Sequence, residues 1–180
     1  MIIIVSLCFF SCASGTTVRE NRPFAWLTDN SKYILMPPEY IENPMDMAQQ
    51  ISAYFAGGDY FLNAYVHANK TGMDMTLLNE LGASVGELSY RNGVVSFSSP
   101  MFPKSLKPEY IVADFQLCFY NAHLLRQTLE DCGLLFENTG LRRRILQGEN
   151  VIIEIEKSSG AVRLVNHLRG YSYTLEGDFE

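Results

Sequence analysis

An alternation of apolar and polar residues with a period of two runs through residues 33–99 and constrains the fold more than any other feature. From Tyr60 to Ala68, for example, every second residue is apolar or aromatic, and Met73, Met75 and Leu77 resume the same rhythm. Successive side chains of a β-strand point to opposite faces of its sheet, so the pattern predicts half-buried strands. The turn sequences at residues 69–72 and 91–93, the second containing Asn-Gly, predict tight hairpins and hence an antiparallel meander.

A different spacing begins at Pro108. Apolar residues then recur at helical intervals, and Pro108 and Gly133 suit the first and last turns of a helix. The repeating apolar positions are Ile111, Phe115, Cys118, Ala122, Leu125 and Leu129. Other sides of this segment are apolar as well, which leaves Asp114, Asn121 and Gln127 on a narrow polar side. The pattern predicts one long, mostly enclosed apolar helix.

Short strands are predicted again at residues 134–137, 141–146, 151–156, 162–166 and 171–175. The fold class is therefore α+β and mainly β: a curled antiparallel sheet of about ten strands that encloses one long apolar helix. Arg142, Arg143 and Arg144 lie in one of these strands. Consecutive strand residues point to opposite faces, so we interpret the three charges as edge or solvent-exposed side chains, with anion binding as the alternative.

The N-terminus predicts the location of the protein. Residues 1–10 are uncharged and mostly apolar, too short to span a bilayer but suited to the core of a secretory signal. This segment and the following Ser11-Cys12-Ala13 resemble a bacterial lipoprotein signal, which implies that Cys12 carries the lipid anchor. An ordinary cleaved signal and a buried first strand are the alternatives. The sorting rule for bacterial lipoproteins, applied to Ala13, implies the outer membrane, with the protein facing the periplasm.

The remaining residues divide into a tether and a folded domain. Residues 13–30 lack periodicity and contain Gly, Thr, Asn and Pro, which is typical of a flexible linker. Residues 31–180 then form a single domain, since the whole chain of 180 residues has the length of one domain.

Composition and motifs exclude several functions. The formal net charge of −6 lacks the basic surface that nucleic-acid binding requires. His67, His123 and His167 do not have the spacing of metal ligands, and we find no catalytic or cofactor-binding motif. We therefore predict a protein that is not an enzyme and has no metal or cofactor. Met73, Met75 and the other internal methionines suit either a packed core or a cavity for varied apolar guests.

Several segments resemble a known group of proteins. The sequence Pro-Glu-Tyr-Ile-Val-Ala-Asp-Phe-Gln-Leu at residues 108–117, the helix body up to Arg126, and residues 141–149 and 153–156 are similar to an uncharacterised family of bacterial envelope lipoproteins related to LolB. The resemblance implies a LolA/LolB-like half-barrel over an apolar cavity that shelters acyl chains. The candidates for the lining of this cavity are Leu62, Met75, Phe115, Phe119 and Leu125.

LolB also carries a leucine in a protruding Asn-Pro-Leu-Gly loop that touches the membrane. This chain has Asn79-Glu80-Leu81-Gly82, so the resemblance makes Leu81 a candidate membrane contact, with a plain hairpin turn as the alternative. The predicted function is an anchored lipoprotein that binds or transfers an acyl chain, a lipid or a lipoprotein. The main alternative is an accessory or scaffold lipoprotein of lipid biosynthesis with a closed core and no ligand, and a hydrolase of lipid intermediates is a third hypothesis.

Overall fold

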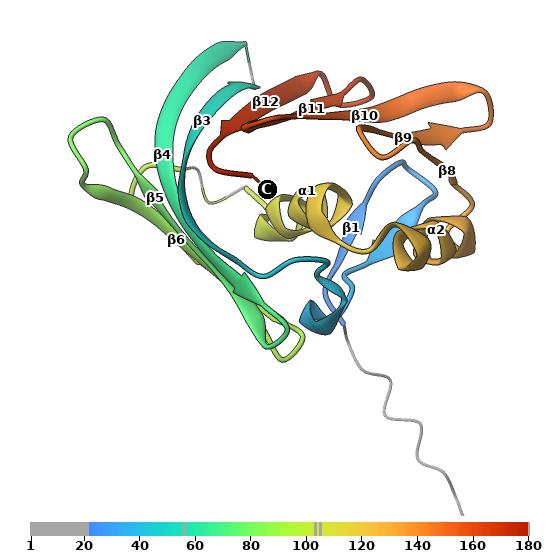
Figure 1. Ribbon diagram of the computed structural model, residues 1–180, viewed down its shortest axis with the longest axis horizontal. Helices are drawn as coiled ribbons and strands as arrows, with labels where there is room; N and C mark the ends of the chain where they lie inside the picture. The colour runs from blue at the N-terminus through green and yellow to red at the C-terminus, as the bar shows by residue number, and fades with distance from the viewer. Residues whose placement is uncertain (1–21, 56, 103, 105, 180) are drawn as a thin grey trace, which may run out of the picture.

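A ten-stranded antiparallel sheet dominates the fold and curls around a helix without closing (Figure 1). The computed structural model describes residues 22–55, 57–102, 104 and 106–179. The strands of the first half are β3 (Met45–Phe55), β4 (Gly58–Asn69), β5 (Gly72–Leu78), β6 (Ser84–Arg91) and β7 (Val94–Ser98). Those of the second half are β8 (Leu135–Asn138), β9 (Arg142–Gln147), β10 (Asn150–Ser158), β11 (Ala161–Asn166) and β12 (Tyr171–Glu176).

The sheet consists of two meanders that meet where β3 pairs with β12, with Ile51 opposite Leu175. β7 and β8 form its two edges, so the sheet is open. The strand alternation predicted from sequence is confirmed on β4. Ala64 and Val66 are at most 1% exposed on the concave face, whereas Phe61 is 63% exposed on the outer face. The Asn-Gly turn is also present, and Asn92 and Gly93 both have positive φ, as tight hairpins between twisted strands require.

The prediction of one long apolar helix is wrong. The chain forms α1 (Pro108–Phe119) and α2 (Ala122–Asp131), and Tyr120 between them is extended and forms a β-bridge with Ile41. One cause of the break is local, because the Asn121 side chain accepts hydrogen bonds from the backbone N–H groups of His123 and Leu124 at 3.0 and 3.3 Å. Asparagine is a preferred N-cap residue, and here it begins a second helix instead of continuing the first.

The domain begins earlier than residue 31. β1 (Phe24–Trp26) and β2 (Lys32–Ile34) form a small hairpin, and a 3₁₀ turn follows at Pro38–Tyr40. β1 packs against α1, and Ala25 and Leu27 are 1% and 3% exposed. Residues 24–30, predicted as the end of the tether, therefore belong to the folded domain, and Ala25 and Leu27 are part of its core. Cys12, the predicted signal segment and the tether up to residue 21 lie outside the described residues.

The three consecutive arginines differ in their environments. Arg142 and Arg144 form ion pairs with Glu156 and Glu154, as predicted for solvent-exposed charges. Arg143 is only 3% exposed, and its Nη1 donates to the carbonyl oxygens of Leu117 and Cys118 at 2.8 and 3.0 Å. Its expected solvent exposure is wrong, because its side chain points to the concave face and there caps the last turn of α1.

Candidate functional site

The concave face of the sheet is the candidate site. Register and alternation place every second residue of β3 and β4 on this face, and Ile51 lies opposite Leu62. From that pair towards the β3–β4 hairpin, the apolar side chains of this face are half-buried. The rings of Phe55 and Tyr60 stack there, with centroids 4.0 Å apart. We call this surface the upper wall. It consists of Ile51, Ala53, Phe55, Tyr60 and Leu62.

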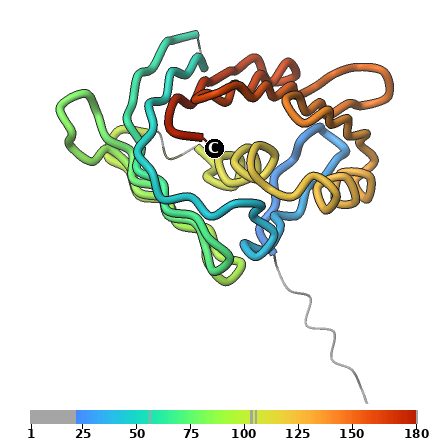
Figure 2. The backbone as a smooth tube through the Cα atoms, in the orientation of Figure 1, coloured from blue at the N-terminus to red at the C-terminus, as the bar shows by residue number. Residues whose placement is uncertain are grey.

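The deeper part of the concave face is packed core. α1 lies inside the concavity (Figure 2), where Phe115 is 5% exposed and Met75 on β5 is 8% exposed. Phe115 also contacts Phe119 on the next turn of α1, with ring centroids 4.9 Å apart. These two helix residues and Met75 lie on the same side of the sheet, but Phe115 and Met75 are buried by their neighbours.

The five predicted cavity residues therefore do not form one lining. Leu125 is fully buried on α2, which packs against β8 and β2, so it does not continue the side of α1 that carries Phe115. Only Leu62 and Phe119 remain half-buried. For Leu125 the reason is the helix break at Tyr120, which places it on a different helix from Phe115.

The C-terminal segment Gly177–Phe179 enters the concavity after β12, and Figure 1 shows the chain end beside α1. The ring of Phe179 stacks on that of Phe119, with centroids 5.7 Å apart and an interplanar angle of 21°. Gly177 lies against Met47 and Gln49 of β3. Lys157 of β10 places its Nζ 5.8 Å from the centroid of Phe119. The chain end thus covers the half-buried end of α1.

Gln49 on β3 is a polar residue of the concave face. It is 3% exposed, and neither its Oε1 nor its Nε2 has a hydrogen-bond partner. Sequence analysis did not single out Gln49 or Phe179. The alternation of Met45, Met47 and Ile51 could have placed Gln49 inward, since all four share one face. Phe179 lies beyond the last strand, where no periodicity exists.

A buried carboxyl group lies between α1 and the sheet. Asp114, predicted on a polar helix side, is only 7% exposed, because this side of α1 faces β12 and not solvent. Tyr171 Oη donates to Asp114 Oδ2 at 2.8 Å, and Asn166 Nδ2 donates to Tyr171 Oη at 3.2 Å. Burial raises the pKa of Asp114 to about 7 despite the Tyr171 hydrogen bond. Burial likewise raises the pKa of the Cys118 thiol to about 12, so this thiol is an uncharged core group.

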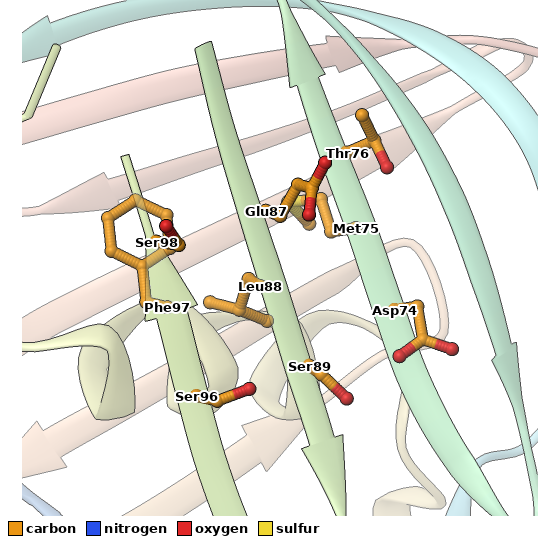
Figure 3. A pocket seen from close by; sticks show the side chains of 9 residues that line it. All are labelled: Asp74, Met75, Thr76, Glu87, Leu88, Ser89, Ser96, Phe97 and Ser98. Atoms are coloured by element: carbon orange, nitrogen blue, oxygen red, sulfur yellow. The ribbon is translucent and has the colours of Figure 1, made fainter. Parts of the chain in front are cut away.

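Two depressions lie on the outer face of the sheet. The first, of about 400 Å³, is drawn in Figure 3. Its polar lining consists of Asp74, Thr76, Glu87, Ser89, Ser96 and Ser98. The second, of about 430 Å³, is lined by Leu141 and by residues of β9 to β12 that include the paired Arg142 and Glu156. Neither lies between the sheet and α1. Apolar side chains complete the two linings, namely Met75, Leu88 and Phe97 in the first and Leu141 and Ala161 in the second.

Leu81 is the most exposed large apolar residue described, at 92%. It occupies the turn between β5 and β6, where Asn79 Oδ1 accepts the backbone N–H groups of Leu81 and Ala83 at 3.0 and 2.9 Å. Gly82 follows with a φ of +78°, which favours glycine. These contacts hold the turn in one conformation and point Leu81 into solvent.

The three histidines are separated in the fold. His67 lies on β4, His123 on α2, and His167 after β11. Among the residues described, no three His, Cys, Asp or Glu side chains form a group that could hold a metal ion. In the same part of the chain, no helix has the length and hydrophobicity needed to cross a membrane.

Comparisons with known proteins address the family of the chain. A search among curated proteins finds no significant match. A family model described as "Protein of unknown function (DUF3261)" matches residues 46–177, which run from β3 to the residue after β12 and include both helices. Because this match covers well over half of the sequence, the chain belongs to the DUF3261 family.

Proposed function

We propose that the protein binds an acyl chain on the upper wall of its half-barrel and acts as a non-enzymatic lipid carrier of the bacterial envelope. The observation that carries the proposal is the half-buried apolar upper wall, on the concave side of an open sheet. Burial of a methylene group contributes about 0.8 kcal/mol, so six methylenes placed on this wall contribute about 5 kcal/mol before entropic costs. Binding of this kind needs no catalytic group.

The same proposal includes the membrane. Lipid attached to Cys12 would hold the domain at the outer membrane, facing the periplasm. Leu81 would then contact the bilayer, and its 92% exposure on a well-defined turn supports this role. The partner of the protein is in this view a lipid, or a lipoprotein whose acyl chains it shelters. The resemblance to LolB-related carriers points in the same direction.

A second candidate function is an accessory or scaffold lipoprotein with a closed core. The burial of Phe115, Leu125 and Met75 favours it, because these three positions cannot line a cavity without movement of α1 or α2. The two functions differ in one respect that can be measured: whether an acyl chain contacts the upper wall.

The test uses the full chain in cell membranes and a photoactivatable palmitic acid that carries a diazirine and an alkyne. Leu62→Glu introduces a charge on the upper wall, and Phe61→Glu introduces the same charge next to it on the outer face. We expect labelled peptides from β3 and β4, a loss of labelling of about tenfold in Leu62→Glu, and unchanged labelling in Phe61→Glu. Circular dichroism is the control that both variants are folded. Absence of label from the upper wall, or equal labelling of both variants, would overturn the proposal.

A further inference from the structure

The concave face contains a buried amide without a partner. Gln49 is 3% exposed, and both polar atoms of its side chain lack hydrogen bonds. Its neighbours on the same face of β3 are Met47 and Ile51, and Ala64 lies opposite it on β4. An unpaired buried amide is costly, and native proteins seldom retain one without a reason.

Gln116, the second buried glutamine, has a side-chain amide with a purely structural role. Gln116 on α1 is fully buried, and its Oε1 accepts from Tyr33 Oη at 3.1 Å and from the Met36 N–H at 2.9 Å. Its Nε2 donates to the Met36 carbonyl oxygen at 2.7 Å. Gln116 therefore ties β2, the segment after it and α1 together. Gln49 makes none of the corresponding contacts, so it does not have this kind of structural role.

The position of Gln49 relates it to the upper wall. It lies two residues from Ile51 on the same face of β3, at the boundary between the packed core around Val66 and the half-buried upper wall. The C-terminal segment lies beside it, and a Cβ at position 177 would lie 3.4 Å from Gln49 Cβ. A ligand that lies along the upper wall would reach Gln49 with one end.

The chemistry of an amide limits what that end can be. Gln49 offers a donor at Nε2 and an acceptor at Oε1 side by side, and only a group that both accepts and donates pairs with the two atoms. A neutral carboxyl group or an alcohol does so, whereas an ester accepts only. Apolar surroundings raise the pKa of a carboxyl group, which favours its neutral form at this place.

We infer that Gln49 binds the O–H-bearing head group of a single-chain lipid, a neutral fatty acid or a fatty alcohol, whose tail lies along the upper wall. The inference rests on the proposed function and deepens it by naming the class of ligand. The head group satisfies the amide, and Ile51 and Leu62 contact the first part of the tail. The C-terminal segment Gly177–Phe179 lies over the same place.

The experiment compares three photoactivatable probes of equal chain length: palmitic acid, hexadecanol and methyl palmitate. The full chain in cell membranes is labelled by each probe as wild type, as Gln49→Leu and as Gln50→Leu. Gln50 is the matched control, because it is the next residue of β3 and its side chain lies on the exposed outer face. Thermal unfolding of each variant is measured in parallel.

We expect the wild type and Gln50→Leu to take up hexadecanol about five- to tenfold more than methyl palmitate, which corresponds to one or two hydrogen bonds. Palmitic acid should label like the alcohol at pH 5 and more weakly at pH 8, where the free acid is ionised. The Gln49→Leu variant should be labelled equally by all three probes. It should also unfold at the same or a higher temperature than wild type, because the substitution removes an unpaired buried amide.

Three results would overturn the inference. If Gln49→Leu keeps the preference for hexadecanol while the upper wall is labelled, the head group does not bind Gln49 and the proposed function stands without it. If no probe labels the upper wall of the wild type, both the inference and the proposed function fail. A loss of labelling together with a lower unfolding temperature in Gln49→Leu would assign Gln49 to the core and likewise refute a head-group site.

Discussion

Asp114→Asn tests the electrostatics of the core. Asp114 on α1 faces Tyr171 and Tyr173 of β12, with Cys118 one turn along the helix, and the positive charge of Arg169 acts on it. Burial raises its pKa from 3.8 to about 7, and the Tyr171 hydrogen bond and Arg169 offset this effect only in part. The substitution keeps the shape of the side chain and removes the charge.

The sign of the effect follows from proton linkage. Between pH 3.8 and about 7 the folded protein holds the Asp114 proton, whereas the unfolded chain has released it. The free energy of unfolding therefore decreases as the pH rises through this window. The difference between the two pKa values of Asp114 corresponds to about 4 kcal/mol of unfolding free energy. The buried carboxylate destabilises the folded protein by this full amount above pH 7 and not at all below pH 4. Asp114→Asn should unfold with a similar free energy to wild type at pH 4 and be up to about 4 kcal/mol more stable at pH 8.

The assay is urea denaturation at five pH values between 4 and 8, followed by the fluorescence of Trp26, the single tryptophan of the chain. Asp74→Asn provides a contrast of opposite sign. The Arg91 guanidinium holds the pKa of Asp74 below its usual value, so this change should destabilise the protein near neutral pH and have less effect at acid pH. A difference between Asp114→Asn and wild type that does not change with pH would refute the reasoning.

Three further changes test the helix break, the chain end and the exposed turn. Asn121→Ala removes the N-cap of α2 and should lower the free energy of unfolding by about 1 kcal/mol, whereas Gln127→Ala on the exposed side of α2 should change it little; equal effects would contradict the capping role. Phe179→Ala uncovers the ring of Phe119 and should increase the fluorescence of a hydrophobic dye without a large loss of stability; unchanged dye binding would show that the chain end covers no accessible apolar surface. Leu81→Ser should reduce association with lipid vesicles and leave unfolding unchanged, and vesicle binding equal to wild type would exclude Leu81 as the membrane contact.

Much of the strand pattern can be predicted from local sequence. The alternation around Val66 and the Asn92-Gly93 turn depend on neighbouring residues only, because period-two burial and positive φ are properties of a few consecutive residues. The strong strand formers of β10 and β11 likewise mark their own strands. The beginning of the first helix at Pro108 and the apolar side that carries Phe115 also follow from spacing.

The helix break and the candidate site depend on contacts between distant parts of the chain. Tyr120 leaves the helix because it can bridge Ile41, and Arg143 turns inward because the carbonyl groups at the end of α1 need donors. Gln49 and Phe179 lie over 120 residues apart, and Phe179 reaches α1, and Gly177 reaches Gln49, only when β12 pairs with β3. Periodicity reports which face of an element is buried, but the partner that buries it, and any apolar surface left uncovered, are set by how the two meanders close around the helices.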